Sequence, residues 1–168
     1  TDSIAALTRK IAKELECGSK DVWLWKNRHV FLTDGSTFSM PDTTENQKAF
    51  PQHTNQKKGV GFPLARFVCM TSLATGAVVD FSMGAFKGKG KGELFHAKFQ
   101  LKQLNAGDIL AADRFYLSYF FTALVLERRA DFITKNHEAR NFNIISSQRL
   151  CKGDSIVTLR KPRIPHTG

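Results

Sequence analysis

The sequence has few cysteines, and their arrangement indicates neither a metal site nor a disulfide framework. Cys17, Cys69 and Cys151 are odd in number and far apart, and no C-x-x-C pairs them with the five histidines. The histidines show no ligand spacing of their own. The sequence therefore favours neither a zinc centre nor a disulfide-rich extracellular domain.

Long apolar runs and a phosphate-binding loop are missing as well. No apolar run is long enough to span a bilayer, and no charged leader followed by an apolar segment opens the chain. The stretch GKGKG at 88–92 does not meet the P-loop pattern G-x-x-x-x-G-K-[ST]. We expect no membrane partner, and a reducing cytoplasm as the compartment.

Acidic residues are scarce relative to basic ones. The chain carries 25 Lys and Arg against 15 Asp and Glu, for a net charge of +10 and a pI of about 9.8. This balance favours a polyanionic partner, although ribosomal and membrane-surface proteins share it. At 168 residues and 42% hydrophobic, the chain is long enough to close one core, so we expect one folded domain.

Helical periodicity marks the first element. Residues 3–16 predict an amphipathic helix, with Ser3 as N-cap, Gly18 as the stop, and one apolar face formed by Ile4, Leu7, Ile11 and Leu15. The run HVFLT then predicts a short strand that ends at Asp34, where Gly35 permits a sharp exit. Residues 39–61 are polar and broken by proline and glycine, which predicts a long loop.

The rest of the chain alternates between strand and helix patterns. A hairpin is expected first, then a glycine-lysine loop leading into a helix, a strand, a nearly all-apolar helix packed on both sides, and a last strand. These elements cover residues 62–73, 77–83, 84–104, 108–113, 118–129 and 131–134. The order β-β-β-α-β-α-β predicts an α/β fold with a mixed sheet flanked by helices.

Two aspartates occupy matching positions in this order. Asp34 and Asp113 each follow an apolar strand, and in a ribonuclease-H-like arrangement the first and fourth strands lie side by side. Two close carboxylates repel each other unless they share a proton or hold a cation, and Mg²⁺ prefers such oxygen ligands. An aspartate at a strand end is also a common turn former or helix cap, and for either residue alone that interpretation stays open.

Three stretches resemble a known family. LTDGSTFSMPDTTENQKAFPQ, GVGFPLARFVCMTSLATGAVVDFSMGAFKGKGKGEL and GDILAADRFYLSYF closely resemble the insertion-sequence-four family of bacterial transposases, over roughly residues 22–162. The resemblance implies a ribonuclease-H-like core that uses Mg²⁺ or Mn²⁺ to cut transposon ends and join them to target DNA. It implies that Asp34 and Asp113 are catalytic metal ligands. It further implies a bacterial, nucleoid-associated enzyme that forms a homodimer when full length.

The third acidic ligand of the family is not found. Its glutamate lies in a Tyr-x-x-Arg-x-x-x-Glu-x-x-x-x-x-x-Lys signature, which neither Tyr116 nor Tyr119 begins. The acids after Asp113 are poor substitutes: Glu127, Asp131, Glu138 and Asp154. The resemblance therefore implies a C-terminally truncated core, with a helical lead-in at 1–28, the catalytic core at 29–140 and the start of a β-rich insertion at 141–168.

Basic residues near the two aspartates are candidate contacts for double-stranded DNA, although a solvated surface explains such residues equally well. The candidates are Arg114, the loop lysines Lys87, Lys89 and Lys91, and, further on, Arg140, Arg160 and Lys161. We expect this chain alone to cut DNA little or not at all. The alternatives are a non-catalytic DNA-binding remnant of a transposase, and a stand-alone ribonuclease-H-like nuclease that recruits a local acid.

Overall fold

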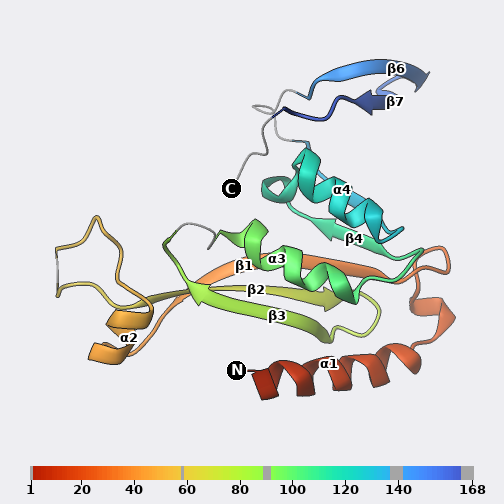
Figure 1. Cartoon of the computed structure of the whole chain (residues 1–168). Helices are drawn as coiled ribbons and strands as arrows, with labels where there is room; N and C mark the ends of the chain where they lie inside the picture. The colour runs from red at the N-terminus through yellow and green to blue at the C-terminus, as the bar shows by residue number, and fades with distance from the viewer. Residues whose placement is uncertain (1, 58, 89–91, 137–141, 164–168) are drawn as a thin grey trace.

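A five-stranded mixed sheet organises the chain. The computed structural model describes residues 2–57, 59–88, 92–136 and 142–163, and the strand order is β3-β2-β1-β4-β5 (Figure 1). An antiparallel meander forms one half, and two parallel strands form the other. The strands are β1 (Val30–Ser39), β2 (Leu64–Ser72), β3 (Val78–Ala85), β4 (Ile109–Ala112) and β5 (Asp131–Thr134). The α/β class with a mixed sheet and the pairing of the first strand with the fourth are confirmed, and the predicted element order holds except for helix α2 between β1 and β2.

Helices pack on this sheet. The α-helices are α1 (Asp2–Cys17), α2 (Thr44–Ala49), α3 (Glu93–Gln100) and α4 (Tyr119–Glu127), and the 3₁₀ turns are η1 (Asp21–Trp23), η2 (Leu101–Gln103) and η3 (Arg114–Tyr116). Helix α1 packs on β3, α3 packs on β2 and β3, and α4 packs along β5. In the described part of the chain, no helix is long and apolar enough to cross a membrane.

The core lies between the sheet and the helices. Val68 and Met70 of β2 and Leu110 of β4 are at most 1% exposed, as are Phe121 and Val125 of α4. Because side chains alternate along a strand, Phe31 and Thr33 of β1 are buried, whereas Leu32 and Asp34, which alternate with them, are exposed. The Thr33 hydroxyl donates to the carbonyl of Cys69. One face of the centre of the sheet is therefore shielded from solvent.

The first strand is longer than its sequence predicts. It continues through Gly35 to Ser39, still paired with β2, so Asp34 lies inside a strand and the expected end at Asp34 is wrong. Only the parallel partner stops there, since the last β1–β4 pair is Thr33 with Ala112. Gly35 stays extended instead of turning, and its missing side chain leaves room for Glu93 of α3.

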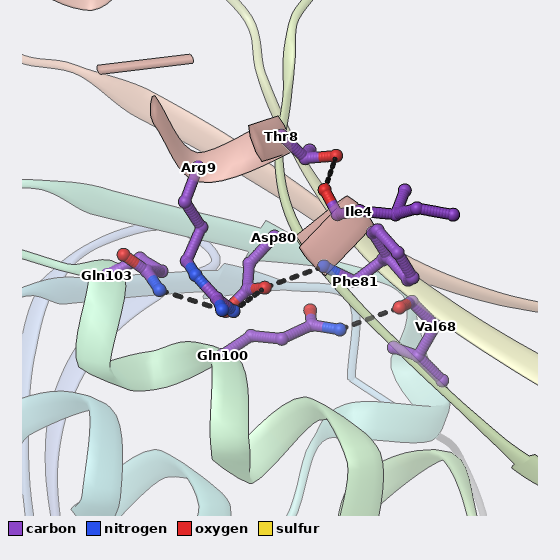
Figure 2. A network of polar contacts seen from close by, with 8 residues as sticks. All are labelled: Ile4, Thr8, Arg9, Val68, Asp80, Phe81, Gln100 and Gln103. Carbon is purple, nitrogen blue, oxygen red and sulfur yellow. Dashed lines mark hydrogen bonds and ion pairs between the residues drawn. The ribbon is translucent and has the colours of Figure 1, made fainter. Parts of the chain in front are cut away.

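Helix α1 presents a different face to the sheet from the one that its apolar periodicity suggests. The stripe of Ile4, Leu7, Ile11 and Leu15 is 48–63% exposed, whereas Ala5 and Ala12 are buried. Polar contacts explain this orientation. Arg9 Nη1 donates to Asp80 Oδ1 at 2.8 Å, and Gln103 donates to the other oxygen of that carboxylate (Figure 2). A buried carboxylate needs a cation, so the Arg9 face of the helix turns inward.

Two smaller expectations also fail. The segment 39–61 is not loop throughout, because Thr43 caps the short helix α2 by accepting from the Asn46 N–H. Helix α4 is not packed on both sides: Phe121 and Val125 are buried, but Leu126 is 54% exposed. After β5 the chain forms a hairpin of β6 (Ile144–Cys151) and β7 (Asp154–Leu159), in which every strand residue except Leu159 is exposed.

Candidate metal and nucleic-acid site

Asp34 and Asp113 lie at matching positions on two neighbouring parallel segments of the chain. Thr33 and Ala112 form the last pair between β1 and β4, and each aspartate is the next residue along the chain. Neighbouring strands lie about 4.8 Å apart, so the backbones at the two aspartates are adjacent. Both residues are exposed. The predicted neighbourhood of the two aspartates is therefore present at the level of the backbone.

Each aspartate also has a local structural role. Asp113 caps η3, because its Oδ1 accepts from the Phe115 N–H at 2.8 Å. Asp34 Oδ1 accepts from the Gly35 N–H at the same distance. In the described part of the chain no Lys, Arg or His forms an ion pair with either carboxylate. Asp113 is thus a helix cap, and this hydrogen bond uses one of its two carboxylate oxygens.

A further acid, Glu93, packs against β1 at Gly35, the residue that follows Asp34, and was missed by sequence reasoning. Glu93 is the first residue of α3 and rests over Gly35, where a Cβ would lie 2.6 Å from Glu93 Cγ and 2.8 Å from Oε2. Its Oε1 is 3.7 Å from Arg66 Nε on β2. The search for a third acid covered only residues after Asp113. A glutamate opening a helix directly after a glycine-lysine loop was the available signal.

The buried hydroxyl of Tyr116 lies within electrostatic range of the three acids. Tyr116 ends η3 and is completely buried, and its hydroxyl has no hydrogen-bond partner among the described residues. Burial raises the pKa of this hydroxyl far above its usual value of 10.0, and the negative charges of Glu93, Asp34 and Asp113 raise that pKa further. The charges of all three carboxylates therefore act on one buried hydroxyl.

The acids expected as substitutes lie elsewhere. Asp131 is at the opposite end of the parallel strands from Asp113, where it pairs with Ile109 in register and forms an ion pair with Arg28 at 2.6 Å. Glu127 is exposed at the end of α4, and Asp154 opens β7 in the exposed hairpin. Glu138 lies outside the described residues. None of those described joins Asp34 and Asp113.

The carboxylates of Asp34 and Asp113 suit a divalent cation that keeps most of its water ligands. Among the described residues, no three His, Cys, Asp or Glu side chains gather closely enough to ligate one ion together. Mg²⁺ commonly takes only one or two carboxylates and fills its remaining positions with water and phosphate oxygens. Asp34 and Asp113 have the right chemistry and strand positions for this, so they are the residues that could hold the ion.

The predicted DNA contacts separate into three groups. Arg114 directly follows Asp113 and is exposed, and Lys87 Nζ donates to the Thr54 hydroxyl in the loop before β2. Arg160 and Lys161 are exposed just after β7. Lys89, Lys91 and Arg140 lie outside the described residues. Arg114 is thus the basic candidate next in sequence to the acidic pair.

A histidine lies next to the Arg66–Glu93 ion pair. His96 of α3 is 5% exposed, and its Nδ1 lies 2.7 Å from the Ser82 hydroxyl oxygen. Burial lowers the pKa of His96, and the Arg66 guanidinium lowers that pKa further. This histidine is therefore neutral near pH 7 and adds no positive charge to the site.

The chain was compared with protein families, curated proteins and solved structures. No protein-family model, curated protein or solved structure matches the chain.

Proposed function

We propose that this chain is the catalytic core of a ribonuclease-H-like transposase, which cuts and transfers DNA strands with the help of Mg²⁺ or Mn²⁺. One observation carries the proposal. Asp34 and Asp113 follow the last paired residues of two adjacent parallel strands in a β3-β2-β1-β4-β5 sheet. The motif resemblance to the insertion-sequence-four transposases supports the same assignment.

The chemistry proposed for the site is attack on a phosphodiester. A water oxygen attacks the phosphorus, the bond from phosphorus to the 3′ oxygen breaks, and that oxygen leaves as the 3′-hydroxyl after taking up a proton. In the transfer step the 3′-hydroxyl is the attacking group and a target strand supplies the phosphorus. When bound, the cations stabilise the charge that develops on the attacking and leaving oxygens.

The residues of the chain have distinct roles in this proposal. Asp34 and Asp113 would hold the cation, and one oxygen of each carboxylate accepts from a local backbone N–H group. Arg114, exposed beside Asp113, contacts the phosphate next to the scissile bond. Lys87, Arg160 and Lys161 bind the backbone of double-stranded DNA further away, helped by the net charge of +10.

A stand-alone ribonuclease-H-like nuclease is the second candidate. Glu93 favours it, because a nuclease without the downstream glutamate signature needs a third acid from within residues 1–168. The two candidates share the site and differ in whether this chain cuts by itself. If the activity depends on the glutamate signature of the family, residues 1–168 alone should cut DNA little or not at all.

The test measures binding and cleavage separately. The chain is titrated with a short DNA duplex over a salt series, and is then incubated with supercoiled plasmid and Mn²⁺. We expect binding that weakens steadily with salt, little nicking, and unchanged duplex binding for Asp34→Ala and Asp113→Ala. Absent or salt-independent binding would contradict the DNA assignment. Robust nicking that Asp113→Ala abolishes would favour the nuclease.

A further inference from the structure

We propose that the groove between α3 and α4 is a docking site for an acidic amphipathic helix of a partner protein. The residues that line this groove do not include Asp34 or Asp113, so the interaction is separate from the proposed DNA chemistry. The partner helix places its apolar side chains in the groove and its acidic side chains along the two edges.

Two neighbouring helices form the groove. One wall is α3 together with the η2 turn that continues it, and the other wall is the C-terminal half of α4 (Figure 1). The groove has a volume of about 770 Å³ and opens to solvent. Amphipathic helices bind partner proteins by laying an apolar face into such hydrophobic grooves. The shape of the site therefore suits a third helix.

Apolar side chains make up half of the groove lining. Leu101, which is 4% exposed, and the half-buried Leu124 are its least exposed members. Phe95 and Phe99 on the α3 wall are 39% and 54% exposed. The fold thus leaves much of both rings in water, and aromatic side chains are enriched where proteins bind one another. The groove offers apolar surface to a ligand that carries apolar side chains.

The charged lining of the groove is mainly basic, and this determines the charge of the partner. Lys98 and Lys102 belong to the α3 wall, and Arg128 lies at the end of α4. Among the described lining residues Glu127 is the only acid. All three cations are exposed, and within the described part of the chain none of them forms an ion pair. Positive charge on both walls selects a helix with acidic residues on both flanks of its apolar face.

A peptide suits this surface better than a nucleic-acid strand does. Successive unpaired bases stack on the faces of aromatic side chains. Phe95 and Phe99 instead meet edge to face, with ring centroids 5.0 Å apart and ring planes at 80°, so they do not present parallel faces along a strand. The carboxylate of Glu127 would also repel a phosphate. Leucine or phenylalanine side chains of a helix, in contrast, can pack against both rings and the leucines below them.

The probe is a synthetic fluorescent peptide of about 15 residues that can form an amphipathic helix, with leucines on one face and glutamates on both flanks of that face. A matched peptide carries lysine in place of each glutamate. Fluorescence anisotropy measures how tightly each peptide binds the whole chain over a salt series. We expect the acidic peptide to bind at least about tenfold more tightly than the lysine peptide, and less tightly as salt rises. No binding of the acidic peptide, or equal binding of both peptides, overturns the proposal.

Phe99→Ala tests the apolar surface of the groove. Because Phe99 is more than half exposed, the variant should fold, and it should bind the acidic peptide about tenfold more weakly. Phe62→Ala is the matched control, since Phe62 is 60% exposed just before β2, and its affinity should equal that of the unmodified chain. Circular dichroism checks that both variants are folded. Equal affinities of the two variants would show that the peptide binds elsewhere.

Reversal of the two α3-wall lysines tests the charge. A chain with both Lys98→Glu and Lys102→Glu should bind the acidic peptide at least about tenfold more weakly and the lysine peptide more tightly, which unfolding cannot produce. Lys48→Glu with Lys57→Glu changes the net charge equally and should leave both affinities within about twofold. The proposal is overturned if the double reversal behaves like this control. It is also overturned if Phe99→Ala abolishes binding of a single-stranded oligonucleotide or self-association of the chain in sedimentation, because the groove would then hold nucleic acid or a second copy.

Discussion

The five-stranded sheet and the β6–β7 hairpin are built from similar residues but differ in burial. Along β2 buried and half-buried side chains alternate, and Val68 and Met70 are at most 1% exposed. Along β6 and β7 the residues are exposed on both faces, including Ile145 and Ile156 at 58%. Helices pack on the sheet, whereas among the described residues no helix packs substantially on the hairpin. Strand pairing alone therefore gives the hairpin little stability.

This comparison also explains where the candidate site lies. Asp34 lies in β1 and Asp113 directly follows β4, so the packed sheet fixes the backbones of both residues. A site needs its groups held to within a fraction of an ångström, which an unpacked hairpin cannot provide. Arg160 and Lys161 at the hairpin are suited to loose contact with phosphates instead.

The largest contrast should come from apolar truncation. Phe121 is fully buried against Tyr116 and Phe132, so Phe121→Ala should lower the free energy of unfolding by about 3–5 kcal/mol. Ile156→Ala in the hairpin should change it by less than about 0.5 kcal/mol. Urea unfolding followed by circular dichroism measures both. Equal losses would show that the hairpin is packed as tightly as the sheet.

Charge removal should give the next largest difference. The Asp80 side chain is 3% exposed and depends on Arg9 for its counter-charge. Arg9→Met should therefore cost about 2–3 kcal/mol of unfolding free energy, because a buried carboxylate is left without a cation. Arg149→Met removes an exposed arginine of the hairpin and should cost under about 0.5 kcal/mol. A small loss for Arg9→Met would mean that water reaches Asp80.

Glycine substitutions should separate the two regions more finely. A Cβ at Gly84 of β3 would lie 2.8 Å from Cε1 of His96, so Gly84→Ala should destabilise the whole fold by about 1–3 kcal/mol. Gly153 has φ +84° in the hairpin turn, and Gly153→Ala should strain that turn alone. The urea concentration at the midpoint of global unfolding should be the same for Gly153→Ala as for the unmodified chain. Equal shifts of the urea midpoint for Gly84→Ala and Gly153→Ala would contradict the view that the hairpin contributes less to stability than the sheet.

The smallest effect is a pH dependence that originates in the sheet. Because the pKa of His96 is lowered in the folded chain, the unfolded chain binds a proton first as pH falls below the usual value of 6.5. Stability should therefore be full above that pH and fall below it, by at most about 1.4 kcal/mol per pH unit for one proton. Thermal unfolding between pH 7.5 and 5 measures this. The same slope in His96→Gln would exclude His96 as its origin.

Local patterns predicted the five strands of the sheet because each contains a short apolar run near turn residues. The same patterns could not give the extent of β1, since Gly35 signals a turn in sequence but makes room for Glu93 in space. They predicted helix α1 and its apolar stripe, but not which face of the helix packs on the sheet. Periodicity counts Ile4 and Leu7, yet the orientation is set by Arg9, whose partner Asp80 is far away in the chain.

The candidate site was predicted in part for the same reason. Asp34 and Asp113 stand out because each follows an apolar strand, and the pairing of β1 with β4 places them together. Glu93 precedes Asp113 in sequence and opens a helix, where a glutamate is common. Only the approach of α3 to Gly35 distinguishes it from an ordinary helix start.

The parallel pairing of β1 with β4 also bears on how the chain folds. β1, β2 and β3 are joined by local antiparallel connections, whereas β4 reaches β1 only after β2, β3 and α3 have all been traversed. Closing so long a connection is entropically costly and slow, so we expect the meander to form early and β4 to dock late. Asp113 would then reach Asp34 only in the final, rate-limiting stage. A chain that has not completed this step carries a folded meander without a cation site.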